Sequence, residues 1–270
     1  MEPHIQEEIR ESLCNLPLEY KEMLPEKYEK IGDILIIHLH SVLTPYKKDI
    51  GEAYKKAFNV KTVLQKGKIR GEFRVPRFEI LAGSSTVTIH RENKILYKLD
   101  LSKVMFSAGN IHERIRMSTL PDDETVVDMF AGIGYFTLPI AKHCHSHVHA
   151  VEKNTDAYHF LCTNIELNHV ESFVTPHLID CRDFHGTADR VIMGHPRAYN
   201  YLDTAFSICE KGFIHYHEFT PEGKWERIHT RLRNAASRAG RSISIEEIRK
   251  IKKFSPGVWH VVCDVHVSSI

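Results

Sequence analysis

The sequence has 270 residues, of which 42% are hydrophobic and 26% are charged. This is an ordinary globular composition, and the length is enough for one large domain or two smaller ones. The six cysteines are scattered without a CxxC pair, which excludes a disulfide framework and a zinc module. The longest apolar run, around Ile34–Ile37, is too short for a membrane helix, and the polar N-terminus is unlike a signal peptide. We expect a cytoplasmic protein with no metal and no membrane segment.

Charge is distributed unevenly along the chain. Lys47–Glu79 has ten Lys or Arg against four Asp or Glu, and Lys224–Lys253 has ten against three. Between them, Pro121–Arg190 has four basic residues against eleven acidic ones. Two basic segments flanking an acidic one favour a polyanion bound across two parts of the protein. The alternative is that both basic segments are solvated helix faces.

The N-terminal part of the chain predicts a small α+β domain at residues 1–110. Helical spacing of apolar residues and turn signals at Gly and Pro define its elements. In chain order these are a helical region within residues 1–30 that ends near Pro25, a strand at Asp33–His38, a helix at Pro45–Ala57, a strand at Thr62–Gln65, and a meander ending in hairpin strands Thr86–His90 and Ile95–Leu101.

From Glu124 onward, strands alternate with helices, which predicts a parallel sheet with crossover helices in a domain at 111–270. The expected strands are Thr125–Met129, His147–Glu152, Val174–Ile179, Arg190–Gly194 and Gly212–His217. The expected helices are Tyr135–Lys142, Asp156–Asn168 and Tyr201–Glu210. Strands Ile243–Lys253 and Gly257–Val267 then form a terminal hairpin. This pattern is typical of an α/β Rossmann-like domain of the class I S-adenosylmethionine-dependent transferase type, with a mainly parallel seven-stranded sheet. A dinucleotide-binding fold would continue with another strand–helix unit.

The strongest local motif follows the first strand of this domain. A buried strand ends after Asp128, a turn contains Gly132 and Gly134, and a helix begins near Tyr135. The glycines allow the backbone to approach a ligand closely, and the helix N-terminus offers free N–H donors. The turn is not GxGxxG, which disfavours a pyrophosphate site.

Carboxylates also end the next two strands. Glu152 lies twenty residues after Gly132, where a carboxylate can accept both hydroxyls of a ribose, and Asp180 can accept an adenine amino group. Each could instead cap a turn or form a surface ion pair. Together with Asp128 they lie at three successive strand ends, where open α/β sheets bind ligands, so we predict a nucleoside-binding site.

Two segments carry a resemblance to a known family. They are Phe106–Met117 (FSAGNIHERIRM) and Val127–Phe136 (VDMFAGIGYF). Both resemble the family that modifies the guanosine immediately 3′ of the anticodon in tRNA. That family contains tRNA guanine N1-methyltransferases and the aminocarboxypropyltransferases of wybutosine synthesis. The resemblance extends from about Ile31 to the C-terminus.

The two branches differ near the expected fourth strand. The methyltransferases have an Asn-Leu-Pro or Asn-Pro-Pro segment there, which holds the guanine edge. In this chain Met193 takes the place of the asparagine and offers no hydrogen bond to a base. Met193-Gly194 resembles the aminocarboxypropyltransferases instead, as do Ile214–Glu218 and Ser255–Val262.

The resemblance therefore implies transfer of the 3-amino-3-carboxypropyl group of S-adenosylmethionine to 4-demethylwyosine at position 37 in the anticodon loop of phenylalanine tRNA, with release of methylthioadenosine. It places Ser107 and Arg114 beside the cofactor, Glu152 at the ribose, and Asp180 with Cys181 at the adenine. Cys181 departs from that branch, which has Asn there. The expected cofactor-binding residues are Ser107, Arg114, Asp128, Gly132, Gly134, Glu152, Asp180 and Cys181.

Several histidines are further candidates. His195 follows the fourth strand and is the candidate general base, although His195-Pro196 replaces a bulkier pair in the family. His215 and His217 alternate and are expected at the carboxyl edge of the sheet, in a core or cofactor-adjacent role. The alternating His143, His145, His147 and His149 could suggest a metal site, but we favour solvated or capping roles.

The resemblance also favours tRNA phosphate contacts for Arg249–Lys253 over a solvated strand. The same holds for basic residues of the N-terminal domain, namely Lys66, Lys68, Arg70, Arg74 and Arg77. Alternatives remain: a tRNA guanine N1-methyltransferase, a non-catalytic tRNA-binding protein, and a small-molecule methyltransferase, which would leave the basic segments without a purpose.

Overall fold

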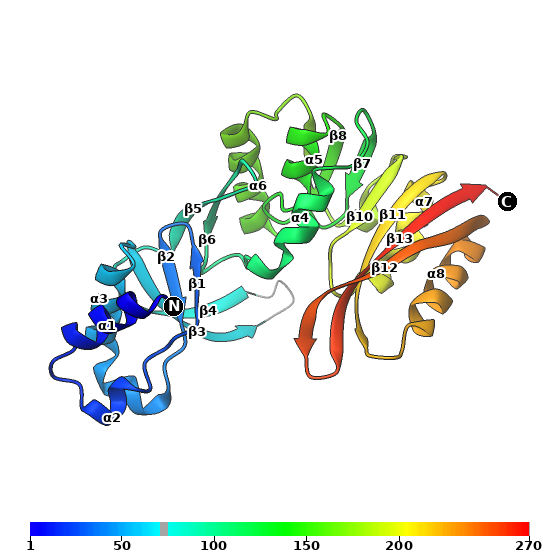
Figure 1. The fold of residues 1–270 in the computed structure, drawn as a ribbon. Coiled ribbons are helices and arrows are strands. Elements are labelled where there is room, and N and C mark those ends of the chain that lie inside the picture. The colour runs from blue at the N-terminus through cyan, green and yellow to red at the C-terminus, as the bar shows by residue number, and fades with distance from the viewer. Residues whose placement is uncertain (71–74, 270) are drawn as a thin grey trace. The chain divides into compact units, whose positions relative to one another are not determined.

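The computed structural model describes residues 1–70 and 75–269, which divide into two compact units (Figure 1). The N-terminal unit is Met1–Glu92 with Leu96–Ala108, and the C-terminal unit is Asn93–Ile95 with Gly109–Ile270. Each unit has its own cluster of buried apolar side chains.

The N-terminal unit is built on a four-stranded sheet in the order β1-β2-β3-β4. Its strands are β1 (Tyr28–Ile31), β2 (Ile34–Ile37), β3 (Thr62–Arg70) and β4 (Val75–Ala82). Only the β2–β3 pair is parallel, and parallel neighbours need a crossover. The 3-10 helix η1 (Ser41–Tyr46) and helix α3 (Lys47–Ala57) supply that crossover, and α3 buries Ile50 and Tyr54 in the core of this unit.

Two further parts complete this unit. β5 (Val87–Glu92) and β6 (Ile95–Asp100) form the expected hairpin. The helical region expected to end near Pro25 is interrupted in the structure. Helices α1 (Pro3–Ser12) and α2 (Leu18–Lys21) are short, and β1 follows. Pro17 restricts the residue before it to extended backbone, which separates the two helices.

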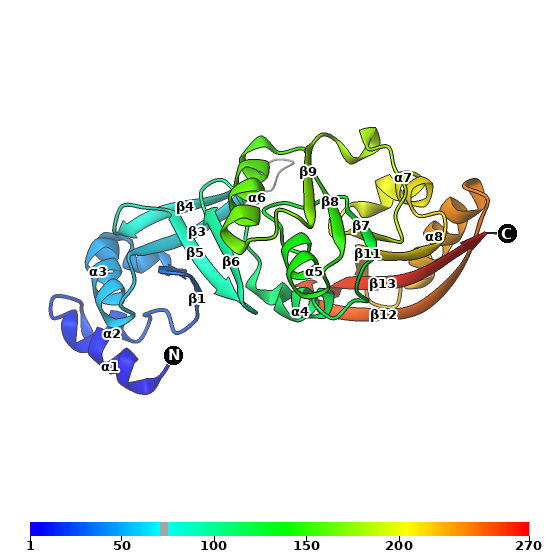
Figure 2. The same cartoon turned by 90° about the horizontal axis from the view of Figure 1, so that it is seen from above.

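The C-terminal unit is a seven-stranded sheet in the order β12-β13-β11-β10-β7-β8-β9 (Figure 2). Its strands are β7 (Thr125–Asp128), β8 (His147–Glu152), β9 (Val174–Leu178), β10 (Arg190–Met193), β11 (Gly212–Pro221), β12 (Arg241–Ser255) and β13 (Val258–Ser269). Strands β7 to β11 are mutually parallel, and β13 and β12 are antiparallel additions. The mainly parallel sheet with a terminal hairpin confirms the predicted fold class.

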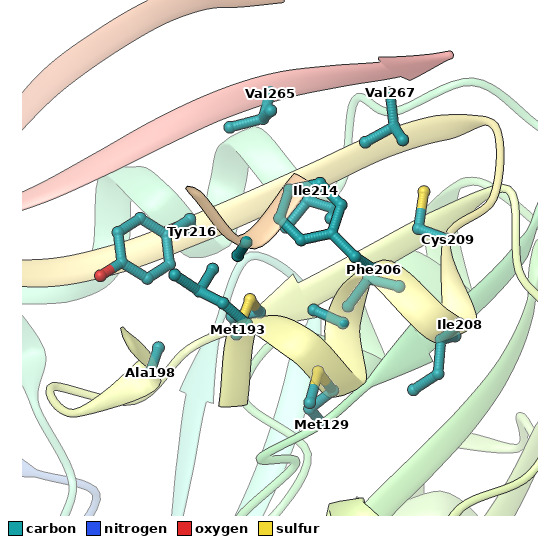
Figure 3. Close-up of a cluster of buried hydrophobic side chains, with 14 of the residues drawn as sticks. Met129, Met193, Ala198, Phe206, Ile208, Cys209, Ile214, Tyr216, Val265 and Val267 are labelled. Atoms are coloured by element: carbon teal, nitrogen blue, oxygen red, sulfur yellow. The ribbon is translucent and has the colours of Figure 1, made fainter. Parts of the chain in front are cut away.

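Helices cover both faces of this sheet (Figure 1). They are α4 (Ile111–Met117), α5 (Thr137–His143), α6 (Thr155–Asn168), α7 (Leu202–Ile208) and α8 (Glu226–Arg238). Helices α4, α5 and α6 pack in sequence on one side, whereas α7 and α8 pack together against the core of the other side. Figure 3 shows this second core, in which Phe206 of α7 lies among Met193, Ile214 and Val265 of the sheet.

The sequence did not predict α8 or the full length of the last three strands. Ile228, Leu232 and Ala235 recur at helical spacing and are fully buried, but the charged residues between them hide the pattern. β11 continues to Pro221, beyond the predicted end at His217, because β13 pairs with it as far as Val258. None of the helices in the described ranges has the length and apolar character needed to cross a lipid bilayer.

Candidate functional site

Asp128 holds the loop between β7 and α5 from inside. Its carboxylate is fully buried and accepts hydrogen bonds from the Thr137 hydroxyl (2.8 Å) and the Phe130 amide (3.4 Å). Burial raises the pKa of Asp128 to about 7, in spite of these hydrogen bonds. The side chain therefore shapes the loop from within the protein, and it does not face the edge of the sheet.

Glu152, at the end of β8, binds the same loop directly. Its Oε2 accepts from the Gly132 amide at 2.8 Å and its Oε1 accepts from the Asn154 amide at 2.7 Å. Burial raises the pKa of Glu152, and these two backbone donors oppose that shift. Each carboxylate oxygen has a second lone pair, so Glu152 can still accept two hydroxyl groups from a ligand.

The glycines of this loop are required by its geometry. Gly132 has φ +57°, and a Cβ there would lie 2.6 Å from the Tyr135 ring. Gly134 has φ +99°, and its Cβ would lie 2.7 Å from Leu138. A side chain at either position would be strained and would collide with a neighbour, so the loop leaves only backbone at the sheet edge.

Asp180, after β9, is held in a bidentate pair. The Arg182 guanidinium donates to both of its oxygens at 2.9 and 2.8 Å, which with the Arg182 amide holds the pKa of Asp180 well below its usual range. Arg182 also lies 5.6 Å from the Tyr201 ring centre. Cys181 is buried in the core, which raises its thiol pKa to about 12. Its thiol is therefore uncharged, and the ionised carboxylate of Asp180 is the available acceptor.

Arg114 enters the site from α4. It is only 2% exposed, and it acts electrostatically on Tyr135, the residue that covers Gly132. Burial raises the pKa of Tyr135 and Arg114 opposes that rise. A buried guanidinium beside the glycine loop is suited to a ligand carboxylate. Ser107 belongs to the N-terminal unit, so its place beside the cofactor stays a prediction.

Met193, at the end of β10, points into the core between the sheet and α7 and is completely buried (Figure 3). The next residue, Gly194, lies under the Phe136 ring, and a Cβ there would be 2.6 Å from that ring. The end of β10 therefore offers neither an amide nor a hydroxyl side chain.

His195 is half-buried and lies against Phe130, with ring centres 5.1 Å apart. Its Nδ1 accepts a hydrogen bond from the Arg197 amide at 3.2 Å. A neutral ring therefore carries its proton on Nε2 and donates from that atom. This tautomer is suited to orienting a nucleobase by donating a hydrogen bond from Nε2. A role as general base stays a prediction.

The alternating histidines of β11 are buried beneath α4. His215 lies between Arg190 and Asp264, at 2.6 Å from each. Because arginine only donates, Nε2 of His215 accepts and Nδ1 donates to Asp264. His217 pairs with His260 through Nδ1 at 3.1 Å, while its Nε2 has no hydrogen-bond partner among the described atoms.

The histidines of β8 are also engaged with neighbours. His147 contacts the Thr175 hydroxyl at 3.0 Å, and His149 contacts His177 at 3.2 Å. Within residues 1–70 and 75–269 there is no group of three or more potential metal ligands. His147 and His149 are half-buried and in contact with side chains of β9, where the sequence had indicated solvated or capping roles.

Internal ion pairs use part of both basic segments. Lys47 pairs with Glu79 and Lys66 with Glu29 in the N-terminal unit. In the C-terminal unit, Arg227 and Arg231 both bind the buried carboxylate of Glu218. Further pairs there are Arg238–Asp203, Arg241–Glu210 and Arg249–Asp264. Arg74 lies outside the described residues, as do the side chains of Lys68 and Arg70.

Tyr135, Phe136 and Arg182 belong to the site but were not predicted. Tyr135 and Phe136 directly follow the predicted glycine turn, and Arg182 is two residues from Asp180. Their closeness in sequence to predicted residues was the available signal. Only the fold shows which of these side chains turn toward the loop.

Comparison with known proteins gives matches over both units. Residues 88–245 match the model of the TRM5/TYW2 methyltransferase domain, and residues 9–86 match that of the TYW2 N-terminal domain. The chain is 44% identical over 270 residues to tRNA(Phe) (4-demethylwyosine(37)-C(7)) aminocarboxypropyltransferase from Pyrococcus horikoshii, with 97% of both chains covered.

A second curated relative, tRNA (guanine(37)-N(1))-methyltransferase Trm5b of Pyrococcus abyssi, is 39% identical over 263 residues, covering 95% of this chain and 79% of that protein. The solved structure of P. horikoshii TYW2 in complex with MeSAdo is similar with a TM-score of 0.89 and 42% identity, covering 97% of this chain and 98% of that one. The chain belongs to the TRM5/TYW2 family.

Proposed function

We propose that this protein transfers the 3-amino-3-carboxypropyl group from S-adenosylmethionine to C7 of 4-demethylwyosine in tRNA(Phe), releasing methylthioadenosine. The observation that carries the proposal is the end of β10. Met193 is buried in the core and Gly194 has no side chain, so no amide is present to hold a guanine edge for N1 methylation. The full-length likeness to a relative with this named activity points the same way.

The residues at the carboxyl edge fit S-adenosylmethionine. Gly132 and Gly134 adopt positive φ angles, so the loop turns at the carboxyl edge of the sheet without side chains at these two positions. Glu152 has the spare lone pairs for the two ribose hydroxyls, and ionised Asp180 can accept from the adenine amino group. Arg114 is the buried cation suited to the carboxylate of the methionine chain.

The chemistry supplied by S-adenosylmethionine is a carbon activated by an adjacent sulfonium. In the proposed transfer, C7 of the base forms a bond to the γ-carbon of the methionine chain. The bond from that carbon to sulfur breaks, the electron pair stays on sulfur, and the C7 proton leaves to solvent or a base. The protein must hold the γ-carbon, not the methyl group, toward the base, which is a positioning effect. In this proposal Arg114 and Tyr135, which interact electrostatically beside the glycine loop, fix the direction of that chain.

The same proposal covers the position of the reacting base in the tRNA, the roles of Ser107 and His195, and the cellular location. We place the reacting base in the anticodon loop, with Ser107 beside the methionine chain and His195 beside the base. Support comes from the position of His195, which lies against Phe130 where the glycine loop begins. The cytoplasmic location expected from the sequence stays a prediction.

A single-turnover assay tests the proposed reaction. The protein is mixed with S-adenosylmethionine and tRNA(Phe), either unmodified or carrying 4-demethylwyosine, and the small product is identified by mass spectrometry. We expect methylthioadenosine with the tricyclic base only. S-adenosylhomocysteine formed with the unmodified tRNA would instead identify a guanine N1-methyltransferase.

A matched pair of variants tests the cofactor site. Glu152→Gln should weaken S-adenosylmethionine binding by about 5- to 100-fold, because the amide NH₂ would face one of the two backbone donors now bound by the carboxylate. Glu166→Gln, at an exposed position on α6, should leave the affinity unchanged. Equal affinities in calorimetric titrations of both variants would contradict the placement of the ribose at Glu152.

A further inference from the structure

Strands β11, β12 and β13 extend past the end of β10 (Figure 1). β10 ends at Met193, opposite Tyr216, whereas β11 continues to Pro221 opposite Val258 of β13. Five further residues at about 3.4 Å each carry this three-stranded extension about 17 Å beyond β10. The extension, residues 217–221 and 250–262, therefore projects from the same sheet edge at which Glu152 lies.

A row of ring contacts connects the extension to the candidate site. The Phe254 ring stacks on Phe219 with centres 4.1 Å apart and planes at 21°. Phe219 then meets His260 at 5.3 Å, and His260 meets His217 at 5.2 Å. His217 lies 5.4 Å from Phe136, the residue that covers the end of β10. The row runs from the end of β10 outward along one face of the extension.

Phe254 is the exposed end of this row. The register of β12 against β13 shifts between Lys253 and Ser255, so Phe254 has no opposite residue in the ladder. Such a bulge turns a side chain in a new direction, and here it sets the ring on Phe219. The residue is nevertheless 53% exposed. One face of an aromatic ring is thus fixed in place, and the residue remains accessible for a second stacking partner.

The charge of the extension fits an anionic partner. Residues 249–259 hold four basic side chains and no acidic one. Arg249 binds Asp264 and Lys250 binds Glu222. Lys253 is exposed, lies 5.4 Å from the Trp259 ring centre, and acts electrostatically on Glu222 without a direct ion pair to any described residue. Lys253 directly precedes Phe254 along β12, so an exposed cation and an exposed aromatic residue are neighbours in the chain. Proteins use this combination for single-stranded nucleic acid.

We infer that this extension is a nucleotide-binding platform for the RNA substrate, in which an unpaired base outside the reacting position stacks on Phe254 and a phosphate binds Lys253. The inference rests on the proposed function for the identity of the RNA. The alternative is that Phe254 only stabilises the hairpin through its contact with Phe219.

Binding of tRNA(Phe) carrying 4-demethylwyosine to the full chain tests the platform. Phe254→Leu retains an apolar contact with Phe219 but has no aromatic face, whereas Phe254→Tyr retains the face. We expect Phe254→Leu to weaken RNA binding by about 5- to 100-fold and Phe254→Tyr to bind as the unaltered chain does. Lys253→Gln should lower the slope of log affinity against log salt by about one, and Lys211→Gln, at the opposite end of β11, should not.

Three further results separate the outcomes. S-adenosylmethionine affinity and unfolding midpoints should be equal in all variants, because none of these residues lies in the glycine loop. RNA affinity that is the same in Phe254→Leu and Phe254→Tyr would overturn the platform, even if methylthioadenosine is still produced. Loss of RNA affinity in Phe254→Leu alone, with S-adenosylhomocysteine as the product, would keep the platform and overturn the proposed reaction.

Discussion

Met193, at the end of β10, occupies the place at which the resemblance to guanine N1-methyltransferases would put an asparagine. A methionine there offers no hydrogen bond to a base edge. In the fold its side chain has no exposed surface and lies among Ile214, Phe206 and Met129 (Figure 3). The difference from a methyltransferase at this position is therefore both the missing amide and a core that depends on an apolar side chain.

This position yields a stability prediction. Met193→Asn should lower the free energy of unfolding by about 2–5 kcal/mol, since it leaves a cavity and buries an amide without a partner. Met193→Leu conserves the volume and should cost less than about 1.5 kcal/mol. Urea unfolding of both variants at the same pH checks the difference. If Met193→Asn is as stable as Met193→Leu and forms S-adenosylhomocysteine, the side chain at this position turns outward and the buried placement is wrong.

At the residue scale, the sequence indicated which residues lie together where both lie at or just after the ends of predicted strands. Glu152 ends one predicted strand and Gly132 follows the neighbouring one, and the fold joins them by a 2.8 Å hydrogen bond. The sequence did not indicate a pairing whose partner lies on an element that was not predicted. The pairing of Glu218 with Arg231, thirteen residues away on α8, depends on a helix whose pattern was not recognised.

At the scale of elements, the side chains of β11 alternate between the two faces of the sheet. The helix that covers each face determines whether those side chains are buried. Odd-numbered His215 and His217 face α4 and its charged residues, whereas Ile214 and Tyr216 face the core beneath α7. Alternation predicted that the two histidines share a face, but nothing local indicated that α4 would bury that face. Burial lowers the pKa of His217 to about 3, and His215 nearby acts in the same direction.

Stability should therefore fall as the pH falls below about 6.5, the ordinary pKa of histidine. In that range the unfolded chain binds a proton at this residue and the folded chain does not. Protonation therefore stabilises the unfolded state relative to the folded state. Between pH 7.5 and 5.5 the loss from His217 alone is about 1.4 kcal/mol. His217→Phe keeps the ring contacts and should reduce the pH-dependent loss by that amount. Exposed His185→Gln is the control, and equal losses in the His217→Phe variant and the unaltered chain would show that His217 titrates normally.

At the scale of the whole molecule, the predicted order of the strands in the C-terminal unit proved right, although α8 was not predicted. The parallel sheet confines its strand ends to one edge, so the positions of Asp128, Glu152 and Asp180 followed from topology. The N-terminal unit was predicted less well, because proline and short elements broke its first helical stretch. Ser107 lies at the end of the N-terminal unit, and its assignment to the cofactor comes from the resemblance alone.

Hydrogen exchange with and without S-adenosylmethionine tests whether Ser107 contributes to the cofactor site. At a hundredfold excess over its dissociation constant, a ligand that binds only the folded state stabilises it by about 2.7 kcal/mol. We expect slower exchange around Gly132 and Asn154, whose amides bind Glu152, and no change in β2 of the N-terminal unit. Slower exchange of the peptide that contains Ser107 would place that residue at the cofactor. Unchanged exchange there, with protection at Gly132, would confine the cofactor to the C-terminal unit, and no protection at either would contradict the site at the glycine loop.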